Sequence, residues 1–376
     1  MLRALILLLP LFCIGCFSTP DAQERERDDD QTDNQSDQTD QTDQTDQADQ
    51  TDSEEKDERD EKDIKDENED EDEGNDDPVP DVDTAPLRAV EVLFDDQIRT
   101  KVLAELDAAQ ESVRFVSFTF SDSGVMSKLN GLAGNGVDVR GVIGTPVEAG
   151  SPSFPLKIYE DTGDGIVHEK FFVIDEATVL LSSANIAYNN ILNFLVIFRD
   201  AADLAARLAD EFDEFDTGRR GAAKSRPCAE GCPVENGTLY LSPSSCDAVG
   251  GMLDALPAGA EAWLAMYTLT DSAPMYDELL ALPGRGVTLH ATLDDWDSGG
   301  DPANQAALDD LDAAGAAVAY YDGSMLFHHK FFVTGDIVEF GSMNWTYSGC
   351  QKNDELYFIT TDPLLVAPFL GYAQER

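Results

Sequence analysis

Three of the four histidines in this 376-residue chain lie in two short segments that carry nearly the same residues. In the first segment one residue separates His168 from Lys170, and the second repeats this spacing with His328 and Lys330. Because side chains alternate along a strand, each histidine should share a strand face with its lysine. An imidazole can act as a nucleophile or proton carrier near neutral pH, and an ammonium can hold a phosphate oxygen. The repeated pair therefore predicts chemistry on a phosphate group.

A small polar turn follows each histidine and lysine pair. The four turn residues that we expect to bind the phosphate are Ser183, Asn185, Ser342 and Asn344. Their hydroxyl and amide groups are neutral hydrogen-bond donors that complement the charged lysines. Two histidines on core strands could be buried and hydrogen-bonded without a function, but the repetition of the lysine and of the turn argues against that interpretation.

These two segments resemble the signature of the phospholipase D superfamily, H-x-K-x4-D-x6-G-G/S-x-N, which usually occurs twice per active site. The first copy matches from His168 to Asn185, with serine in place of the first glycine. In the second copy the acid, Asp336, lies one place late and the hairpin is one residue shorter. We expect Asp175 and Asp336 to brace their hairpins rather than to touch a substrate.

The resemblance implies a phosphodiesterase whose active site lies between two halves of the fold. In this family one histidine attacks phosphorus to form a phosphohistidine, and the other protonates the leaving alcohol and then activates water. It also implies that no cofactor and no metal are needed, because the lysines offset the developing charge. An acidic residue after the turn, often from the opposite half, orients each histidine in this family.

Only the second copy offers such an acid. Glu355 lies there in Asn-Asp-Glu at 353–355, whereas the first copy has Asn-Phe-Leu at 193–195 in the comparable place. If the pairing crosses the halves, the resemblance implies that Glu355 raises the basicity of His168 and makes it the nucleophile. His328 would then be the acid.

Three further residues could be taken for site residues but are expected to be structural. His329 points to the opposite strand face from its neighbour His328, so we expect it to be structural. His290 is expected to be a satisfied sheet residue, and Trp345 is expected to pack in the core.

The predicted strands and helices occur in the same order in both parts of the globular sequence. Each part begins with a strand and a helix, continues with an alternating strand that ends in a polar turn, and adds a helix stopped by glycines before a third strand. This alternation predicts an α/β fold of two similar α-β-α halves in one chain, with the active site between them. The predicted organisation is a signal peptide at 1–15, a disordered acidic tether at 16–85, half 1 at 86–216, a linker at 217–236 and half 2 at 237–376.

The N-terminal segment predicts export. An apolar run from Ala4 to Gly15 follows Arg3 and is too short for a membrane span. Its end resembles a bacterial lipoprotein signal in which Cys16 is lipidated, which implies an anchor in a membrane and a periplasmic or cell-surface location. Cys13 stands where leucine is usual, so an ordinary cleaved signal with incidental cysteines is the alternative.

The charge of the chain is uneven and strongly acidic. Residues 21–85 contain 31 acidic and 6 basic residues, so they can bury almost no apolar surface and should form a tether that spans about 45 Å. Residues 86–376 contain 44 acidic and 18 basic residues, a net charge of -26. Such a field repels long polyanions and disfavours nucleic acid as a partner, although a saline habitat would equally explain it.

Four cysteines lie beyond the signal region, and they are Cys228, Cys232, Cys246 and Cys350. An even number in an oxidising compartment predicts two disulfides, with three possible connectivities. A metal site is the weaker interpretation, because no histidine lies near them in the sequence.

The sequence therefore predicts a monomeric enzyme that hydrolyses a phosphodiester, with a phospholipid head group as the favoured substrate. A nuclease of the same superfamily is one alternative. A phosphate-binding lipoprotein with a decayed site is another, prompted by the displaced Asp336 and by Leu195 where an acid is expected. The presence of both histidines and both lysines argues against decay.

Overall fold

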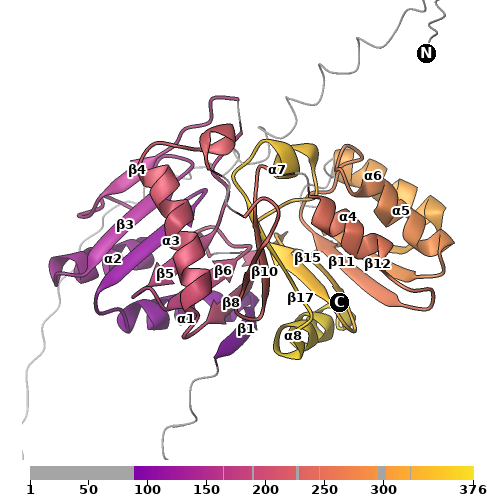
Figure 1. Cartoon of the computed structure of the whole chain (residues 1–376), viewed down its shortest axis with the longest axis horizontal. Helices are drawn as coiled ribbons and strands as arrows, with labels where there is room; N and C mark the ends of the chain where they lie inside the picture. Colours follow the sequence, from indigo (N-terminus) through magenta and orange to yellow (C-terminus); the bar gives the residue numbers. More distant parts are fainter. Residues whose placement is uncertain are drawn as a thin grey trace, which may run out of the picture. The chain divides into compact units, whose positions relative to one another are not determined.

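The computed structural model describes residues 89–376 apart from 164, 189, 226–227, 245, 295–301 and 322. The predicted signal peptide, the lipidation site Cys16 and the acidic tether lie outside the described residues. The described chain forms two mixed α/β halves, each built on its own sheet (Figure 1).

Half 1 contains a seven-stranded sheet in the order β1-β8-β6-β5-β2-β3-β4. Its strands are β1 (Val90–Phe94), β2 (Ser112–Ser117), β3 (Asp138–Ile143), β4 (Leu156–Ile158), β5 (Phe171–Ile174), β6 (Thr178–Ser182) and β8 (Phe194–Phe198). Its helices are α1 (Ile98–Asp107), α2 (Ser123–Gly134) and α3 (Ala202–Asp216). The apolar stripes of α1 and α2 pack on one face of this sheet, and the stripe of α3 packs on the other.

Half 2 repeats this plan in an eight-stranded sheet of order β13-β12-β11-β15-β16-β17-β10-β9. Its strands are β9 (Cys232–Val234), β10 (Gly237–Leu241), β11 (Glu261–Met266), β12 (Thr288–Asp294), β13 (Ala317–Tyr321), β15 (Lys330–Thr334), β16 (Val338–Gly341) and β17 (Leu356–Thr360). Its helices are α4 (Asp247–Asp254), α5 (Tyr276–Gly284), α6 (Pro302–Ala314), α7 (Tyr347–Gln351) and α8 (Pro363–Gln374). Apart from the added edge strand β9, the strand order read from β10 to β13 matches that of half 1 from β1 to β4. The predicted duplicated α/β fold is confirmed.

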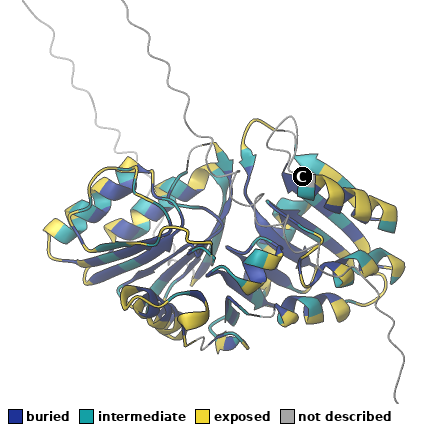
Figure 2. Ribbon diagram, turned by 90° about the horizontal axis from the view of Figure 1, so that it is seen from above, coloured by how far each residue is buried: buried dark blue, intermediate teal, exposed yellow. Residues whose placement is uncertain are grey.

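The central strands of the two sheets carry the same kind of sequence. β5 and β15 follow the two histidine segments, and all their residues are buried. Strands covered on both faces favour continuous apolar runs, which explains the two Phe-Phe-Val stretches at these places. Figure 2 shows the buried strands inside each half and the exposed faces of the helices outside.

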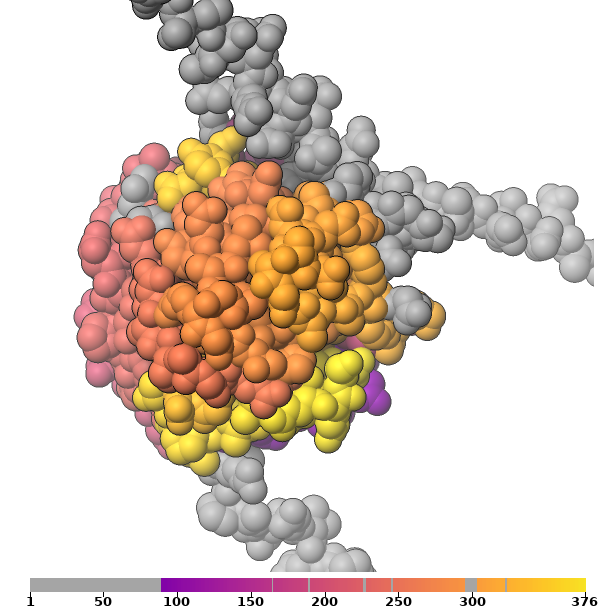
Figure 3. Space-filling view, turned by 90° about the vertical axis from the view of Figure 1, so that its right-hand side faces the viewer, coloured from indigo at the N-terminus to yellow at the C-terminus, as the bar shows by residue number. Residues whose placement is uncertain are grey.

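A shared aromatic core joins the halves. Phe194 and Phe198 on β8 lie 5.7 Å from Phe340 and 5.4 Å from Phe358 of half 2, measured between ring centroids. Phe369 on α8 lies 5.1 Å from Phe194, so the last helix closes this core. In Figure 3 the helices α4, α5 and α6 (orange) cover the outer face of half 2, and α8 (yellow) runs along its edge.

The segment between the halves is tied into both of them. It contains a short 3-10 helix, η2 (Gly221–Ala223), and the second sheet begins inside the predicted linker at β9.

The two expected disulfides are present as Cys228–Cys232 and Cys246–Cys350, which selects one of the three connectivities. None of the helices within the described ranges is long and apolar enough to cross a membrane.

Candidate active site

The two histidines lie at equivalent places and bond across the boundary between the halves. The backbone N–H of His168, just before β5, donates to the carbonyl oxygen of Asp354 in half 2 at 2.9 Å. The N–H of His328, before β15, donates to Leu192 of half 1 at the same distance. There β14 (Leu326–Phe327) pairs with β7 (Ile191–Leu192) in a small parallel sheet built from both halves. Each half thus positions the histidine of the other.

Different groups face the two imidazoles. Nδ1 of His168 lies 2.7 Å from Oε1 of Glu355, as the cross-half pairing predicted. Nδ1 of His328 lies 3.1 Å from Oδ1 of Asn193. The sequence comparison that set Leu195 opposite the acid was therefore wrong by two positions, because Leu195 is a buried residue of β8. Asn193 is the counterpart of Glu355, and sequence reasoning missed it.

The two turn serines hold these orienting groups. Oγ of Ser342 donates to Oε2 of Glu355 at 2.5 Å and accepts from the N–H of Leu356. Oγ of Ser183 donates to Oδ1 of Asn193 at 3.2 Å and also accepts a backbone N–H. A hydroxyl has one hydrogen to donate, and here it is used inside the protein. Phosphate binding by Ser183 and Ser342 stays a prediction that this arrangement does not favour.

The two turn asparagines differ from the serines. Asn185 and Asn344 are both partly buried. Among the described residues, neither side-chain Oδ1 has a hydrogen-bond partner. The unpaired atom is an acceptor in each case, so only the Nδ2 amide hydrogens could serve a phosphate. Their predicted contact with the substrate phosphate fits this arrangement but is not tested by it.

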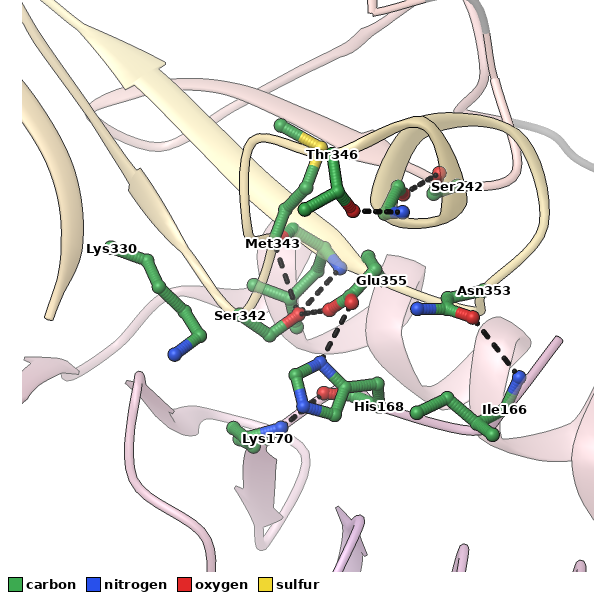
Figure 4. A network of polar contacts seen from close by, with 12 residues as sticks. Ile166, His168, Lys170, Ser242, Lys330, Ser342, Met343, Thr346, Asn353 and Glu355 are labelled. Carbon is green, nitrogen blue, oxygen red and sulfur yellow. Dashed lines mark hydrogen bonds and ion pairs between the residues drawn. The ribbon is translucent and has the colours of Figure 1, made fainter. Parts of the chain in front are cut away.

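The two lysines are buried beside the histidines. Nζ of Lys170 donates to the carbonyl oxygen of His168 at 2.6 Å, and Nζ of Lys330 donates to that of His328 at 3.2 Å. Lys330 also lies over the ring of Tyr267, 4.8 Å from its centroid. Figure 4 shows Lys170 and Lys330 beside the His168 ring, with Glu355 on the opposite side.

Burial and the lysines weaken both imidazoles as bases. Burial lowers the pKa of His168, Glu355 opposes this effect, and both lysines add to it. The pKa of His328 is held well below its ordinary value by burial, by Lys330 and Lys170, and by His168. The charges of both lysines thus act on each histidine. Two ammonium groups beside neutral imidazoles make this site attractive to an anion.

Most of the residues expected to be structural make structural contacts. Asp336 is the exception, because it is exposed and, among the described residues, its backbone N–H rather than its carboxylate forms a hydrogen bond, to Oγ1 of Thr334. The carboxylate of Asp175 accepts three backbone N–H groups ahead of β2, each at 2.8 Å, which fixes that turn. His329 is buried and bonds Tyr372 at 2.7 Å, while Trp345 is fully buried in half 2. His290 stacks on a tryptophan ring outside the site.

Within the described ranges, no cluster of three or more His, Cys, Asp and Glu side chains could hold a metal ion.

The fold and the paired histidines are those of a known family. The chain matches the model of a family described as cardiolipin synthase, PLD-like domain, over residues 102–215 and 256–375. These two segments cover more than half of the chain, one in each half of the fold. The chain therefore belongs to the phospholipase D superfamily.

Two curated relatives are similar to part of the chain. The mitochondrial cardiolipin hydrolase of Xenopus laevis is 35% identical over 113 residues, which are 30% of this chain and 52% of that protein. The same enzyme of Xenopus tropicalis is 34% identical over 119 residues, 31% of this chain and 53% of that protein. The chain thus spans about half the length of these relatives.

Two solved structures resemble the whole two-half arrangement. Phosphatidylserine synthase from Haemophilus influenzae Rd KW20 has a TM-score of 0.58 at 11% identity, covering 76% of this chain and 85% of that one. Polyphosphate kinase from Porphyromonas gingivalis has a TM-score of 0.55 at 15% identity, covering 76% of this chain and 46% of that one. At these identities the likeness concerns the fold alone.

Proposed function

We propose that the protein is a phosphodiesterase that cleaves its substrate through a phosphohistidine on His168. The observation that carries the proposal is the unequal pairing of the two histidines, a carboxylate on His168 and an amide on His328. An ionised carboxylate can only accept, so the Nδ1 of His168 holds the hydrogen and its Nε2 keeps a lone pair for attack.

In the first step, Nε2 of His168 forms a bond to phosphorus as the bond to the leaving alcohol breaks. The imidazole becomes cationic, and Glu355 stabilises that charge. His328 gives its proton to the departing oxygen. Lys170 and Lys330 offset the negative charge that builds on the phosphoryl oxygens.

In the second step, neutral His328 takes a proton from water and the resulting hydroxide attacks phosphorus. The bond from phosphorus to His168 breaks, and a phosphate monoester leaves. His328 is protonated again and His168 is free, so both residues return to their starting states.

The low pKa of His328 fits both of its proposed steps, because the imidazolium gives up its proton readily and the neutral ring is then available as a base. An imidazolium that holds its proton weakly gives it up readily to a leaving group. A bound phosphodiester carries a negative charge, which favours the protonated form of His328 on binding. Asn193 supplies no charge, so the substrate itself promotes protonation.

A phospholipid head group is the favoured substrate. The curated relatives are named as cardiolipin hydrolases, and the net charge of -26 on residues 86–376 disfavours a long polyanion. The predicted export and the lipid anchor at Cys16 would hold the enzyme at a membrane. A nuclease of the same superfamily is the alternative, since the catalytic groups would be the same.

Hydrolysis assays with the full chain test this proposal. A generic phosphodiester, phosphatidylcholine and single-stranded DNA are each incubated with wild type and His168→Ala in the presence of a chelator. We expect wild type to cleave the generic diester and the lipid, and the variant to cleave neither. Cleavage of DNA alone would favour the nuclease, and no turnover of any diester would favour a phosphate-binding protein.

A further inference from the structure

A buried lysine of the connecting segment lies among three carboxylates. Nζ of Lys224 contacts the carboxylates of Glu211, Asp354 at 2.7 Å and Glu169 at 3.6 Å. It also donates to the carbonyl oxygen of Ser242 at 3.0 Å. The side chain of Lys224 is 1% exposed, and those of the three acids are exposed by 2% or less. The ammonium therefore connects half 1, the connecting segment and half 2 in a place that excludes water.

The partners of this ammonium are also the neighbours of the proposed nucleophile. Glu169 follows His168 in the chain, and the carbonyl oxygen of Asp354 accepts the N–H of His168 at 2.9 Å. The N–H of Ser242 donates to the carbonyl oxygen of Glu355 at 2.8 Å. One ammonium thus holds the residues that fix the backbones of both His168 and Glu355.

The charges of this cluster depend on the lysine. Burial raises the pKa of Glu169 well above its usual range, and nearby Glu211 raises it further. Burial also raises the pKa of Asp354, against the lowering effect of Lys224. Burial lowers the pKa of Lys224, but the three carboxylates more than reverse this and keep the ammonium charged. Removing the ammonium would leave buried acids without their counter-charge.

We propose that Lys224 is a positioning residue for the pair of His168 and Glu355. By holding Asp354 and Ser242, it fixes the two peptide groups that set where the imidazole and its carboxylate lie. A displacement of about 1 Å at a nucleophile can cost about 100-fold in rate, so this bracing bears on turnover. The role of the pair in catalysis rests on the proposed function, whereas its geometry does not.

Three variants of the full chain test this. Lys224→Met removes the ammonium, and Lys224→Met combined with Glu211→Gln removes one charge of each sign, which offsets the loss of stability. Lys101→Met is the matched control, because Lys101 also contacts two carboxylates, Glu91 and Glu105, but on the outer helix α1. Each is compared with wild type by kcat and KM on bis(4-nitrophenyl) phosphate and by the NMR signal of the His168 Nδ1–H, assigned with His168→Ala.

We expect both Lys224 variants to lose about 10- to 100-fold in kcat with KM within about twofold, and to shift or lose the His168 signal. Lys101→Met should match wild type in both measurements. The double variant decides the question if the single one does not fold. A double variant with the kcat and NMR signal of wild type would overturn the proposal and leave Lys224 a charge-balancing role. If wild type cleaves no diester, the proposed function fails, while the NMR signal still tests the positioning.

Discussion

At the two histidines, equivalent backbone positions present different groups to Nδ1. Glu355 and Asn193 are each held by a turn serine and each face an imidazole from the other half. The carboxylate supports a positive charge on its ring and the amide does not. The proposed division of roles between nucleophile and acid rests on this single difference in side chain.

Replacing Asn193 with aspartate tests that difference. The new carboxylate would favour the protonated form of His328 and raise its pKa. Since kcat/KM depends on the fraction of free enzyme in which the proposed acid is protonated, its alkaline limb should move to higher pH. The profile is measured for wild type and Asn193→Asp over pH 4 to 9 on phosphatidylcholine, whose alcohol leaving group needs a proton, unlike a nitrophenolate. An unchanged alkaline limb would show that His328 does not control it.

The sequence could reveal some of these residues but not all. The spacing of each histidine and lysine pair, with its following turn, is visible without a structure, and so is the acid Glu355 after the second turn. Asn193 is not visible in this way, because a single asparagine outside the motif does not indicate a role. Counting residues from the turn aligns Leu195, not Asn193, with Glu355. The contact of Nδ1 of His328 with Oδ1 of Asn193, which depends on the backbone pairing of His328 with Leu192, shows which residue faces the second ring.

On the scale of single elements, strand β16 carries a buried acid. Glu339 is 1% exposed, and burial raises its pKa to about 8. In the unfolded chain this carboxyl ionises above its ordinary pKa of 4.5, whereas the folded protein keeps the proton up to about pH 8. The folded state therefore binds more protons between these values, and its stability falls as pH rises through them.

Glu339→Gln should remove this dependence. The variant should resemble wild type in unfolding free energy near pH 4.5 and exceed it near pH 8, by up to about 4 kcal/mol. Urea unfolding of both proteins at several pH values measures the difference. A constant difference across this range would mean that Glu339 does not titrate as its burial indicates.

The two disulfides should contribute unequally. Cys246 and Cys350 lie 104 residues apart, whereas Cys228 and Cys232 are only four apart. Closing a long loop removes more entropy from the unfolded chain. We expect Cys246→Ser with Cys350→Ser to cost about 2–4 kcal/mol and the matched pair Cys228→Ser with Cys232→Ser to cost less. Urea unfolding compares them, and an equal loss would contradict the entropic explanation.

Helices and strands with a clear hydrophobic period could be predicted from the sequence. Strands that form only through contacts between the two halves could not. The apolar stripes of α1, α2, α4 and α5 and the buried runs of β5 and β15 gave the duplicated architecture. The small sheet of β7 and β14 has only two residues in each strand, too few to show a period. Its existence depends on the meeting of the two halves, which is a property of the tertiary fold.

On the scale of the whole molecule, the acidic charge should select among substrates. Repulsion between the protein and a polyanion weakens as salt screens it. Cleavage of single-stranded DNA, if detectable, should rise in kcat/KM between about 0.05 and 0.5 M salt, while cleavage of a small diester should change little. If kcat/KM for DNA instead falls as salt rises, basic side chains bind the strand, which would favour the nuclease.

The central claim is that His168 forms the covalent bond to phosphorus. Wild type, His168→Ala and His328→Ala are mixed rapidly with bis(4-nitrophenyl) phosphate, quenched in base and mapped by mass spectrometry. This substrate has a leaving group that needs no acid, so His328→Ala should still form the adduct and, unable to activate water, should accumulate it on His168. His168→Ala should give no adduct. An adduct on His328 that persists in His168→Ala would contradict the claim and reverse the roles.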